Sequence, residues 1–166
     1  MSNADTSVRN LGQIPFQEMF LDVTACLSKT EDTATCYRPP NMTDHVRLDI
    51  FPPFDDSQYP QFNRSSPVIL FEPGLRCHSQ DMPGNMIIRL AFEAGFRSVA
   101  INRRGHIPGQ KLKAPRWNLF GDIDDLEQTF WKVKEDMLEP NTPIFLHGIS
   151  SGCAVTVTAL SAWDKR

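Results

Sequence analysis

Three short strand-like runs alternate with helix-compatible segments from residue 68 onward, and this order constrains the fold more than any other feature. The runs cover residues 68–71, 97–102 and 143–147, and a helix-compatible segment follows each of them. A continuous apolar run is typical of a strand that is buried on both faces of a parallel sheet. The alternation therefore predicts the α/β class, with a parallel β-sheet, right-handed crossovers and helices on both faces.

The two segments between these runs carry helix signals. The first helix is expected to begin between residues 81 and 85, and Gly95 suits its C-terminal cap, where a left-handed backbone is common. The second is expected to begin at Asp122, whose residue type often caps a helix, and to end before Pro140. Its first turn is acidic, which suits the positive end of the helix dipole.

The chain upstream of residue 68 divides into two parts. Residues 1–44 predict an irregular arm with a short helix around residues 17–27. Residues 45–51 alternate apolar and polar side chains, which predicts a strand with one buried face, and two prolines end it. The expected organisation is an N-terminal arm over residues 1–44 and an α/β unit over residues 45–166.

Composition and motifs argue against several classes of function. The 166 residues carry a formal net charge of −3, which gives no positive surface for nucleic acid or an anionic membrane. The sequence shows no transmembrane segment, no signal peptide, and neither a G-x-G-x-x-G nor a P-loop motif. The 4 cysteines lack metal-binding spacing and are expected as reduced thiols. We therefore expect an intracellular protein, either cytoplasmic or peripherally associated with a membrane.

The third strand-like run leads into the stretch Gly148-Ile149-Ser150-Ser151-Gly152, which has the pattern Gly-x-Ser-x-Gly. A strand before it and a helix after it are the context of a nucleophile elbow. In such a turn Ser150 is strained, and Gly148 and Gly152 avoid collisions between a Cβ and the neighbouring backbone. The N–H of Ser151 then points into the space around the serine oxygen, where the helix N-terminus favours negative charge. An ordinary strand–helix turn is the alternative, and the pentapeptide by itself favours that alternative.

Four stretches together resemble one protein family. They are HVRLDIF at residues 45–51, VILFEPGLRCHSQDMPGNMIIRLAFEAGFRSVAINRRGH at residues 68–106, GDIDDLEQTFWKVK at residues 121–134, and PIFLHGISSG at residues 143–152. In this order they resemble an early strand, an oxyanion turn with its helix and next strand, an acidic helix, and a nucleophile elbow. The chain thus resembles the α/β-hydrolase family, and within it the ABHD1/ABHD2/ABHD3-like (YheT-like) group of serine hydrolases.

The resemblance implies a serine hydrolase that acts on a carboxylic ester, such as a lipid or another small acyl ester, without a metal or organic cofactor. It implies that Ser150 is the nucleophile and that the backbone N–H groups of Leu75 and Ser151 form the oxyanion hole. One departure is the run Ser151-Gly152-Cys153, where the group has a bulky apolar residue and then two glycines. The pocket near the elbow is therefore expected to differ in shape.

The turn after residues 97–102 also belongs to the resemblance. Asn102, Arg104 and Gly105 match the family's turn after its fourth strand, and the resemblance implies a structural role for them. The pair Arg103-Arg104 has two interpretations. It contacts an anionic head group, or it is solvated or binds backbone carbonyls, which is the commoner use of such a pair.

The largest departure from the family is at the C-terminal end. In these hydrolases the acid and the histidine follow the nucleophile, whereas this chain ends at Arg166, just after the elbow helix. The resemblance therefore implies an α/β-hydrolase fold that is incomplete at the C-terminus, with its base and acid outside the chain. A serine hydroxyl without a base is a poor nucleophile, so activity of this chain alone is in doubt. The alternative is a truncated, non-catalytic protein that acts by binding, or an inactive fragment.

Local histidines are poor substitutes for the absent base. His78 follows the oxyanion turn and is a candidate to line the pocket, His106 is expected in a loop, and His147 is expected on a strand that packs on a helix. The strand at residues 143–147 would lack the further neighbour that the family's strand order gives it. Self-association through this exposed apolar edge is therefore predicted.

Overall fold

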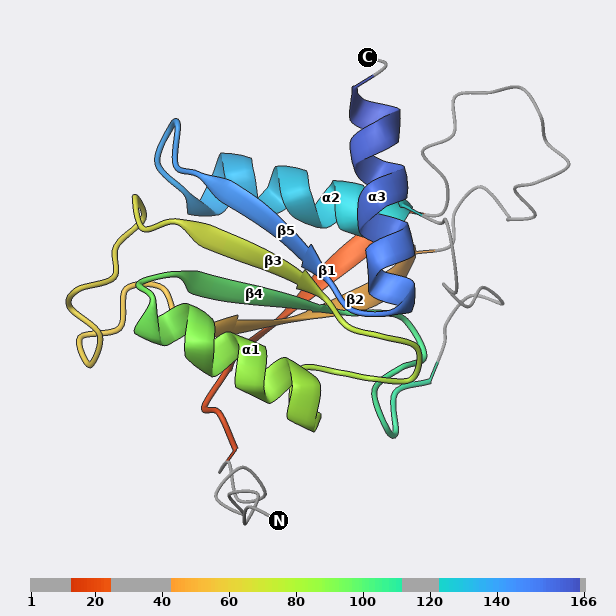
Figure 1. The fold of residues 1–166 in the computed structure, drawn as a ribbon, viewed down its shortest axis with the longest axis horizontal. Helices are drawn as coiled ribbons and strands as arrows, with labels where there is room; N and C mark the ends of the chain where they lie inside the picture. The colour runs from red at the N-terminus through yellow and green to blue at the C-terminus, as the bar shows by residue number, and fades with distance from the viewer. Residues whose placement is uncertain (1–12, 25–42, 112–122, 165–166) are drawn as a thin grey trace, which may run out of the picture.

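A computed structural model describes residues 13–24, 43–111 and 123–164 (Figure 1). In chain order the elements are β1 (Gln17–Thr24), β2 (Thr43–Phe51), β3 (Val68–Glu72), α1 (Met82–Glu93), β4 (Arg97–Asn102), α2 (Asp124–Lys132), η2 (Val133–Met137), β5 (Ile144–Gly148) and α3 (Ser151–Trp163). From β2 onward, each predicted strand and helix is confirmed, with small differences at the ends. The predicted cap Gly95 has φ 84°, as a left-handed C-terminal cap requires.

The five strands form one sheet in the order β1-β2-β4-β3-β5. Strands β4, β3 and β5 are parallel, as the alternation of strands and helices predicted. The pairs β1–β2 and β2–β4 are antiparallel, so the sheet as a whole is mixed rather than parallel. Among the described residues, β5 pairs only with β3 and therefore lies at an edge of the sheet.

The predicted helix around residues 17–27 is wrong, because residues 17–24 form strand β1. β1 pairs with β2 along its whole length, and its Val23 is fully buried in the core while Phe20 is 59% exposed on the other face. The two acidic residues that interrupt this stretch face β2: Asp22 lies 2.5 Å from the ring of His45, and Glu18 lies 3.5 Å from Arg47. Part of the predicted arm is thus a strand of the sheet, while the division at residue 44 stays a prediction.

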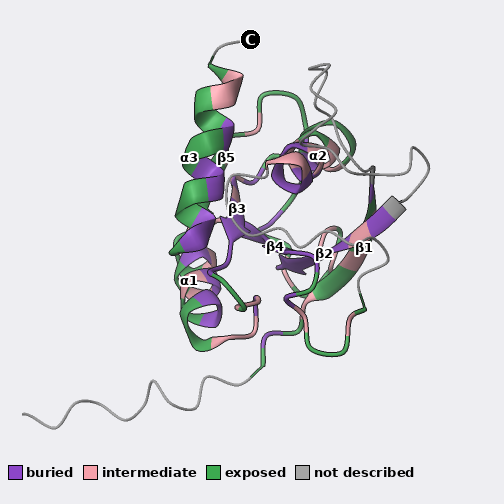
Figure 2. Cartoon of the chain, turned by 90° about the vertical axis from the view of Figure 1, so that its right-hand side faces the viewer, coloured by how far each residue is buried: buried purple, intermediate pink, exposed green. Residues whose placement is uncertain are grey.

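Helices cover both faces of the sheet, as predicted, and each face has its own core (Figure 2). On one face α2 and α3 pack on the strands through Leu126 and Val155, which belong to the same buried cluster as Leu70. On the other face α1 packs through Ile88 near Phe71. Because successive residues of a strand point to opposite faces, neighbouring residues of β3 serve different cores. This arrangement gathers the C-terminal ends of β3, β4 and β5 and the start of α3 at one end of the sheet (Figure 1).

The acidic helix is held to the sheet by a buried ion pair. It runs as α2 and then widens into the π-helical turn η2. Its predicted cap, Asp122, lies outside the described residues. Asp125 is fully buried and accepts two hydrogen bonds from Arg104, at 2.9 and 2.6 Å. This acidic residue therefore anchors the helix to the turn after β4, in addition to any effect on the helix dipole.

Across residues 13–24, 43–111 and 123–164, no helix is both long and apolar enough to span a bilayer. The same residues contain no group of three His, Cys, Asp or Glu side chains that could hold a metal ion.

Candidate active site

Ser150 occupies the turn between β5 and α3, at the end of the sheet where the parallel strands finish (Figure 1). Its backbone has φ 52° and ψ −118°, in a region that favours glycine. A serine held there stores strain on the order of 1–3 kcal/mol, which the surrounding structure must support. Ser150 is exposed, whereas Ser151, the first residue of α3, is buried. The strand, the strained serine and the helix are the geometry that the elbow prediction requires.

Gly148 and Gly152 have no room for a side chain. An added Cβ at Gly148 would lie 2.5 Å from the carbonyl carbon and oxygen of Gly152. An added Cβ at Gly152 would lie 2.2 Å from the carbonyl oxygen of Glu72, at the end of β3. Both distances are far inside van der Waals contact and involve backbone atoms that cannot swing away. The two glycines therefore allow β5, α3 and the end of β3 to approach one another around Ser150.

The turn after β3 lies directly beside Ser150. An added Cβ at Gly74 would lie 3.5 Å from the Cβ of Ser150, which is an ordinary contact distance. The N–H of Cys77 donates to the carbonyl of Gly74 at 3.1 Å and closes the turn. Arg76 has φ 58° and supplies the left-handed position that such a turn needs. The Pro-Gly turn and the elbow thus face each other across one short gap.

The two predicted oxyanion donors lie on these facing turns. Leu75 follows Gly74 and is 39% exposed, and Ser151 follows Ser150 at the first turn of α3. Within the described part of the chain, neither backbone N–H has a hydrogen-bond acceptor. Both N–H groups are therefore available to a ligand, and that of Ser151 also lies at the positive end of the α3 dipole.

Arg103 connects the turn after β3 to the elbow turn through buried hydrogen bonds. Its Nη2 donates to the carbonyl oxygen of Pro73 at 2.6 Å and to the Oγ of Ser151 at 2.7 Å. The side chain is 1% exposed, so these hydrogen bonds are shielded from water. The interpretation of the arginine pair as solvated or carbonyl-binding is confirmed for Arg103 in its second form, because Arg103 is buried and binds the carbonyl of Pro73.

Glu72 is the buried acid next to this arginine. Its carboxylate lies 3.5 Å from the Nε of Arg103, and both side chains are 1% exposed. Burial raises the pKa of Glu72 to about 8, because desolvation penalises the charged form more than Arg103 favours it. The backbone carbonyl of Glu72 accepts the N–H of Ile149 at 3.1 Å. Glu72 therefore touches the elbow through its backbone and the arginine through its side chain.

The contacts of the turn after β4 support the structural role that the resemblance implies. The Oδ1 of Asn102 accepts the N–H of Ser79 at 2.9 Å, and the hydroxyl of Ser79 donates to Asp49 on β2. Arg104 is fully buried in its ion pair to α2. Gly105 has φ 74°, a conformation that side chains rarely adopt. These contacts tie the loop after β3 to β4 and β2.

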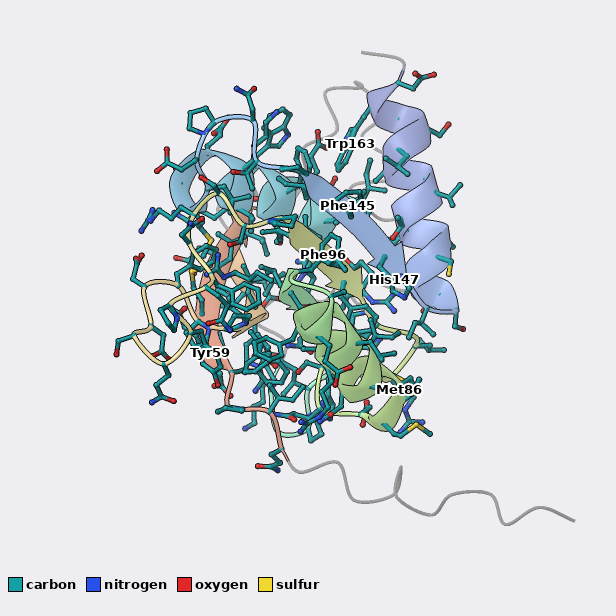
Figure 3. The ribbon with its side chains drawn as sticks, turned by 60° about the vertical axis from the view of Figure 1, so that its left-hand side comes forward. Tyr59, Met86, Phe96, Phe145, His147 and Trp163 are labelled. Carbon is teal, nitrogen blue, oxygen red and sulfur yellow. The ribbon has the colours of Figure 1, made fainter. Side chains whose placement is uncertain are left out.

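None of the described histidines is placed as an obvious partner for Ser150. His78 has its ring Nε2 3.6 Å from Asp81, at the start of α1. His106 is buried in its loop with its ring bound to the backbone, and burial lowers its pKa. His147 is exposed on β5, where its ring lies 5.8 Å from that of Phe71 (Figure 3). His147 thus contacts a strand residue, and its expected packing on a helix stays a prediction.

A pocket of about 560 Å³ opens beside the turn after β3. It is lined by Arg76 and by residues 105–110, which form the loop after β4. His78 is not among the described residues that line it, so its predicted place in a pocket stays a prediction. The pocket therefore opens next to Arg76, the residue that follows Leu75 in this turn.

The prediction of site residues missed the buried pair Glu72 and Arg103. A signal for them exists in the sequence, because Glu72 directly follows the apolar run of β3 and Arg103 directly follows β4. A charged residue at the end of a buried strand needs a partner because an unpaired buried charge is costly, and here Glu72 and Arg103 are each other's partners. The sequence does not show that the fold places these two side chains next to each other.

The comparisons with known proteins agree with the fold. No protein-family model matches the chain. The mouse phospholipase ABHD3 is 35% identical over 86 residues, which are 52% of this chain and 20% of that protein. The chain thus spans about a fifth of the length of this curated relative.

Solved structures show the same fold. A serine hydrolase without a lid from Xanthomonas campestris superimposes with a TM-score of 0.54 at 18% identity, covering 92% of this chain and 60% of that one. The α/β-hydrolase GrgF from a Penicillium species gives a TM-score of 0.55 at 20% identity, covering 90% of this chain and 43% of that one. These findings confirm the expected resemblance. The chain therefore has the α/β-hydrolase fold, is similar to ABHD3 over about half of its length, and corresponds to a part of these proteins.

Proposed function

We propose that this chain carries the nucleophile and the oxyanion hole of a serine hydrolase that cleaves carboxylic esters, with lipid or other acyl esters as substrates. One observation carries the proposal. Ser150 is held with φ 52° at the β5–α3 turn, and the turn that bears Leu75 lies directly beside it. Strain of this kind persists at sites where function needs it. The names of the relatives, a phospholipase and a serine hydrolase, support the reaction class.

In the proposed reaction the Oγ of Ser150 attacks the carbonyl carbon of the ester. The carbonyl oxygen gains negative charge and is held by the N–H groups of Leu75 and Ser151. The alcohol then leaves with a proton, and water cleaves the acyl-serine ester to release the acid and restore the hydroxyl. The pocket beside Arg76 offers room for one end of the substrate.

The proton of Ser150 needs a base, and the described histidines are poorly suited to that role. His78 is engaged by Asp81, and the burial of His106 opposes its protonation. We therefore assign the base to a histidine supplied from outside this chain, in keeping with the family order of serine, acid and histidine. The activity is accordingly proposed for the whole protein rather than for residues 1–166 alone.

A second candidate function is binding through the edge of the sheet. β5 pairs with β3 on one side only within the described chain, and Phe145 on this strand is 50% exposed (Figure 3). Unpaired strand edges with apolar side chains accept further strands. We propose that a second copy of the chain, or a strand from the rest of the protein, pairs with β5.

The hydrolase proposal is tested by ester cleavage. Wild-type protein and its Ser150→Ala variant are expressed in the protein's own cells and recovered with an antibody to residues 71–105. Each is incubated with p-nitrophenyl butyrate, and the mass of the recovered chain is compared with 18.8 kDa. Release of p-nitrophenol by the wild type, lost in Ser150→Ala and kept in the exposed control Thr158→Ala, is the expected result. Equal release by wild type and Ser150→Ala would refute the assignment.

A further inference from the structure

We propose that Arg103 is a positioning residue that holds the two oxyanion donors, the N–H groups of Leu75 and Ser151, in one fixed arrangement beside Ser150. The inference rests on the proposed function, because it assigns Arg103 a role in that same site. Arg103 stands at the unspecified position of the Asn-x-Arg-Gly motif. The resemblance to the family therefore gives it no role, and its contacts alone carry the argument.

The first step is that one nitrogen atom bridges both turns. The Nη2 of Arg103 carries two hydrogens, and its two acceptors are the carbonyl of Pro73 at 2.6 Å and the Oγ of Ser151 at 2.7 Å. One acceptor belongs to the turn after β3, and the other belongs to the first residue of α3. Because both hydrogen bonds start from the same atom, the separation of the two turns is fixed by the geometry of a single planar group.

The second step is that the bridged groups adjoin the donors. The Pro73 carbonyl belongs to the peptide unit before the one that contains the N–H of Leu75. That next unit is fixed by its own carbonyl, since the oxygen of Gly74 accepts the N–H of Cys77 at 3.1 Å. On the other side, the oxygen of Ser150 accepts the N–H of Cys153 at 3.0 Å and fixes the unit that contains the N–H of Ser151. Arg103 thus joins two rigid turns, each of which carries one donor.

The third step is that Arg103 is itself held in place. Its side chain is 1% exposed, and its Nε lies 3.5 Å from the buried carboxyl group of Glu72. Glu72 in turn accepts the N–H of Ile149 through its backbone. A buried, planar guanidinium with partners on several sides has little freedom to rotate. A displacement of one turn therefore displaces the guanidinium and, through it, the other turn.

The consequence concerns the rate of reaction at Ser150. Removing one oxyanion donor typically slows catalysis by about 100-fold to 1,000-fold. Loss of Arg103 leaves both donors present but frees the two turns to shift relative to each other. We expect Arg103→Met to slow the reaction of Ser150 with a fluorophosphonate by about 10-fold to 100-fold, since small misplacements cost rates of this order.

The test compares Arg103 with a matched buried arginine. Arg97 lies at the other end of β4 and donates to the carbonyls of Pro52 and Asn63 at 3.0 and 2.8 Å, far from the elbow. Arg97→Met is expected to retain the wild-type labelling rate in the folded protein. Should Arg103→Met fail to fold, Ser151→Ala removes one acceptor and keeps the donor N–H, with Thr156→Val as the hydroxyl control. Ser151→Ala is expected to slow labelling several-fold, and Thr156→Val to leave it unchanged.

A second readout does not depend on reactivity. In the ¹⁵N-labelled 166-residue chain, Ser151→Ala is expected to shift the amide signal of Leu75, which lies on the opposite turn. The same substitution in an Arg103→Met background is expected to leave the Leu75 signal in place, because the bridge is gone. A Leu75 signal that never responds to Ser151→Ala overturns the positioning role, as do equal labelling rates of wild type and Arg103→Met. If wild-type protein recovered from its own cells is not labelled, the proposed function fails, and the amide signals of the 166-residue chain still decide the role of Arg103.

Discussion

The carbonyl oxygen of Glu72 lies 2.2 Å from the place that a side chain on Gly152 would take. This relationship predicts that Gly152→Ala forces the end of β3 and the start of α3 apart. We expect a loss of about 3 kcal/mol or more in the free energy of unfolding, because backbone atoms cannot move aside as side chains do. Gly74→Ala is the control, since its Cβ meets only ordinary contacts at 3.5 Å. Equal urea midpoints for the two variants would contradict this account of the elbow.

Ser150 holds a conformation that glycine adopts more easily. Its φ of 52° predicts that Ser150→Gly relieves strain that Ser150→Ala retains. The unfolded state of the glycine variant is more flexible, which offsets a part of the gain. We still expect the free energy of unfolding of Ser150→Gly to exceed that of Ser150→Ala by roughly 1 kcal/mol. Ser150→Gly should therefore unfold at a higher urea concentration. The reverse order in chemical denaturation would show that the turn is not strained at this residue.

The raised pKa of Glu72 predicts that stability falls as pH rises. The ordinary value is 4.5 and the value in the folded protein is about 8. Between these two pH values the unfolded chain has lost the proton that the folded protein keeps. The free energy of unfolding therefore decreases from pH 4.5 to pH 8 and levels off above that range.

The measurement for this prediction is the urea midpoint as a function of pH. Glu72→Gln keeps the shape of the side chain and removes its ionisation, so it is expected to reduce the slope over this range. Glu93→Gln, at an exposed position at the end of α1, controls for the loss of one acidic side chain. An unchanged slope in Glu72→Gln would mean that this carboxyl group does not titrate between the two values.

The open edge of β5 predicts self-association of the 166-residue chain. Sedimentation velocity at increasing concentration is expected to show a species of about twice 18.8 kDa. Phe145→Lys places a charge on this edge strand and is expected to keep the chain monomeric. Phe20→Lys is the matched control, because Phe20 is 59% exposed on β1, the strand at the other end of the sheet. A wild-type chain that stays monomeric at every concentration would contradict the prediction.

Local backbone geometry is the part of this site that could be predicted from the sequence. The pattern around Ser150 specifies a tight strand–helix turn, because close approach of backbone requires glycine at positions 148 and 152. The strands and helices from β2 onward were likewise predictable from hydrophobic periodicity.

Relationships between distant residues could not be predicted in the same way. Arg103 lies 30 residues from Pro73 and 48 residues from Ser151, and only the fold brings them within hydrogen-bonding distance. The error at β1 has the same origin. Asp22 interrupts an apolar stretch, and a strand tolerates it here because it contacts His45 on the neighbouring strand, a partner that no local pattern contains. Tertiary pairing thus decided the structure of residues 17–24.

The most direct test of the central claim is to locate the adduct of a fluorophosphonate probe by tandem mass spectrometry, in protein recovered from its own cells. The probe bonds through phosphorus to an activated serine oxygen and releases fluoride. The account predicts a single adduct on Ser150, absent from Ser150→Ala and retained when Ser151 is replaced by alanine, although formed more slowly. An adduct on another residue, or none in folded wild-type protein, would contradict the assignment of Ser150 as the nucleophile.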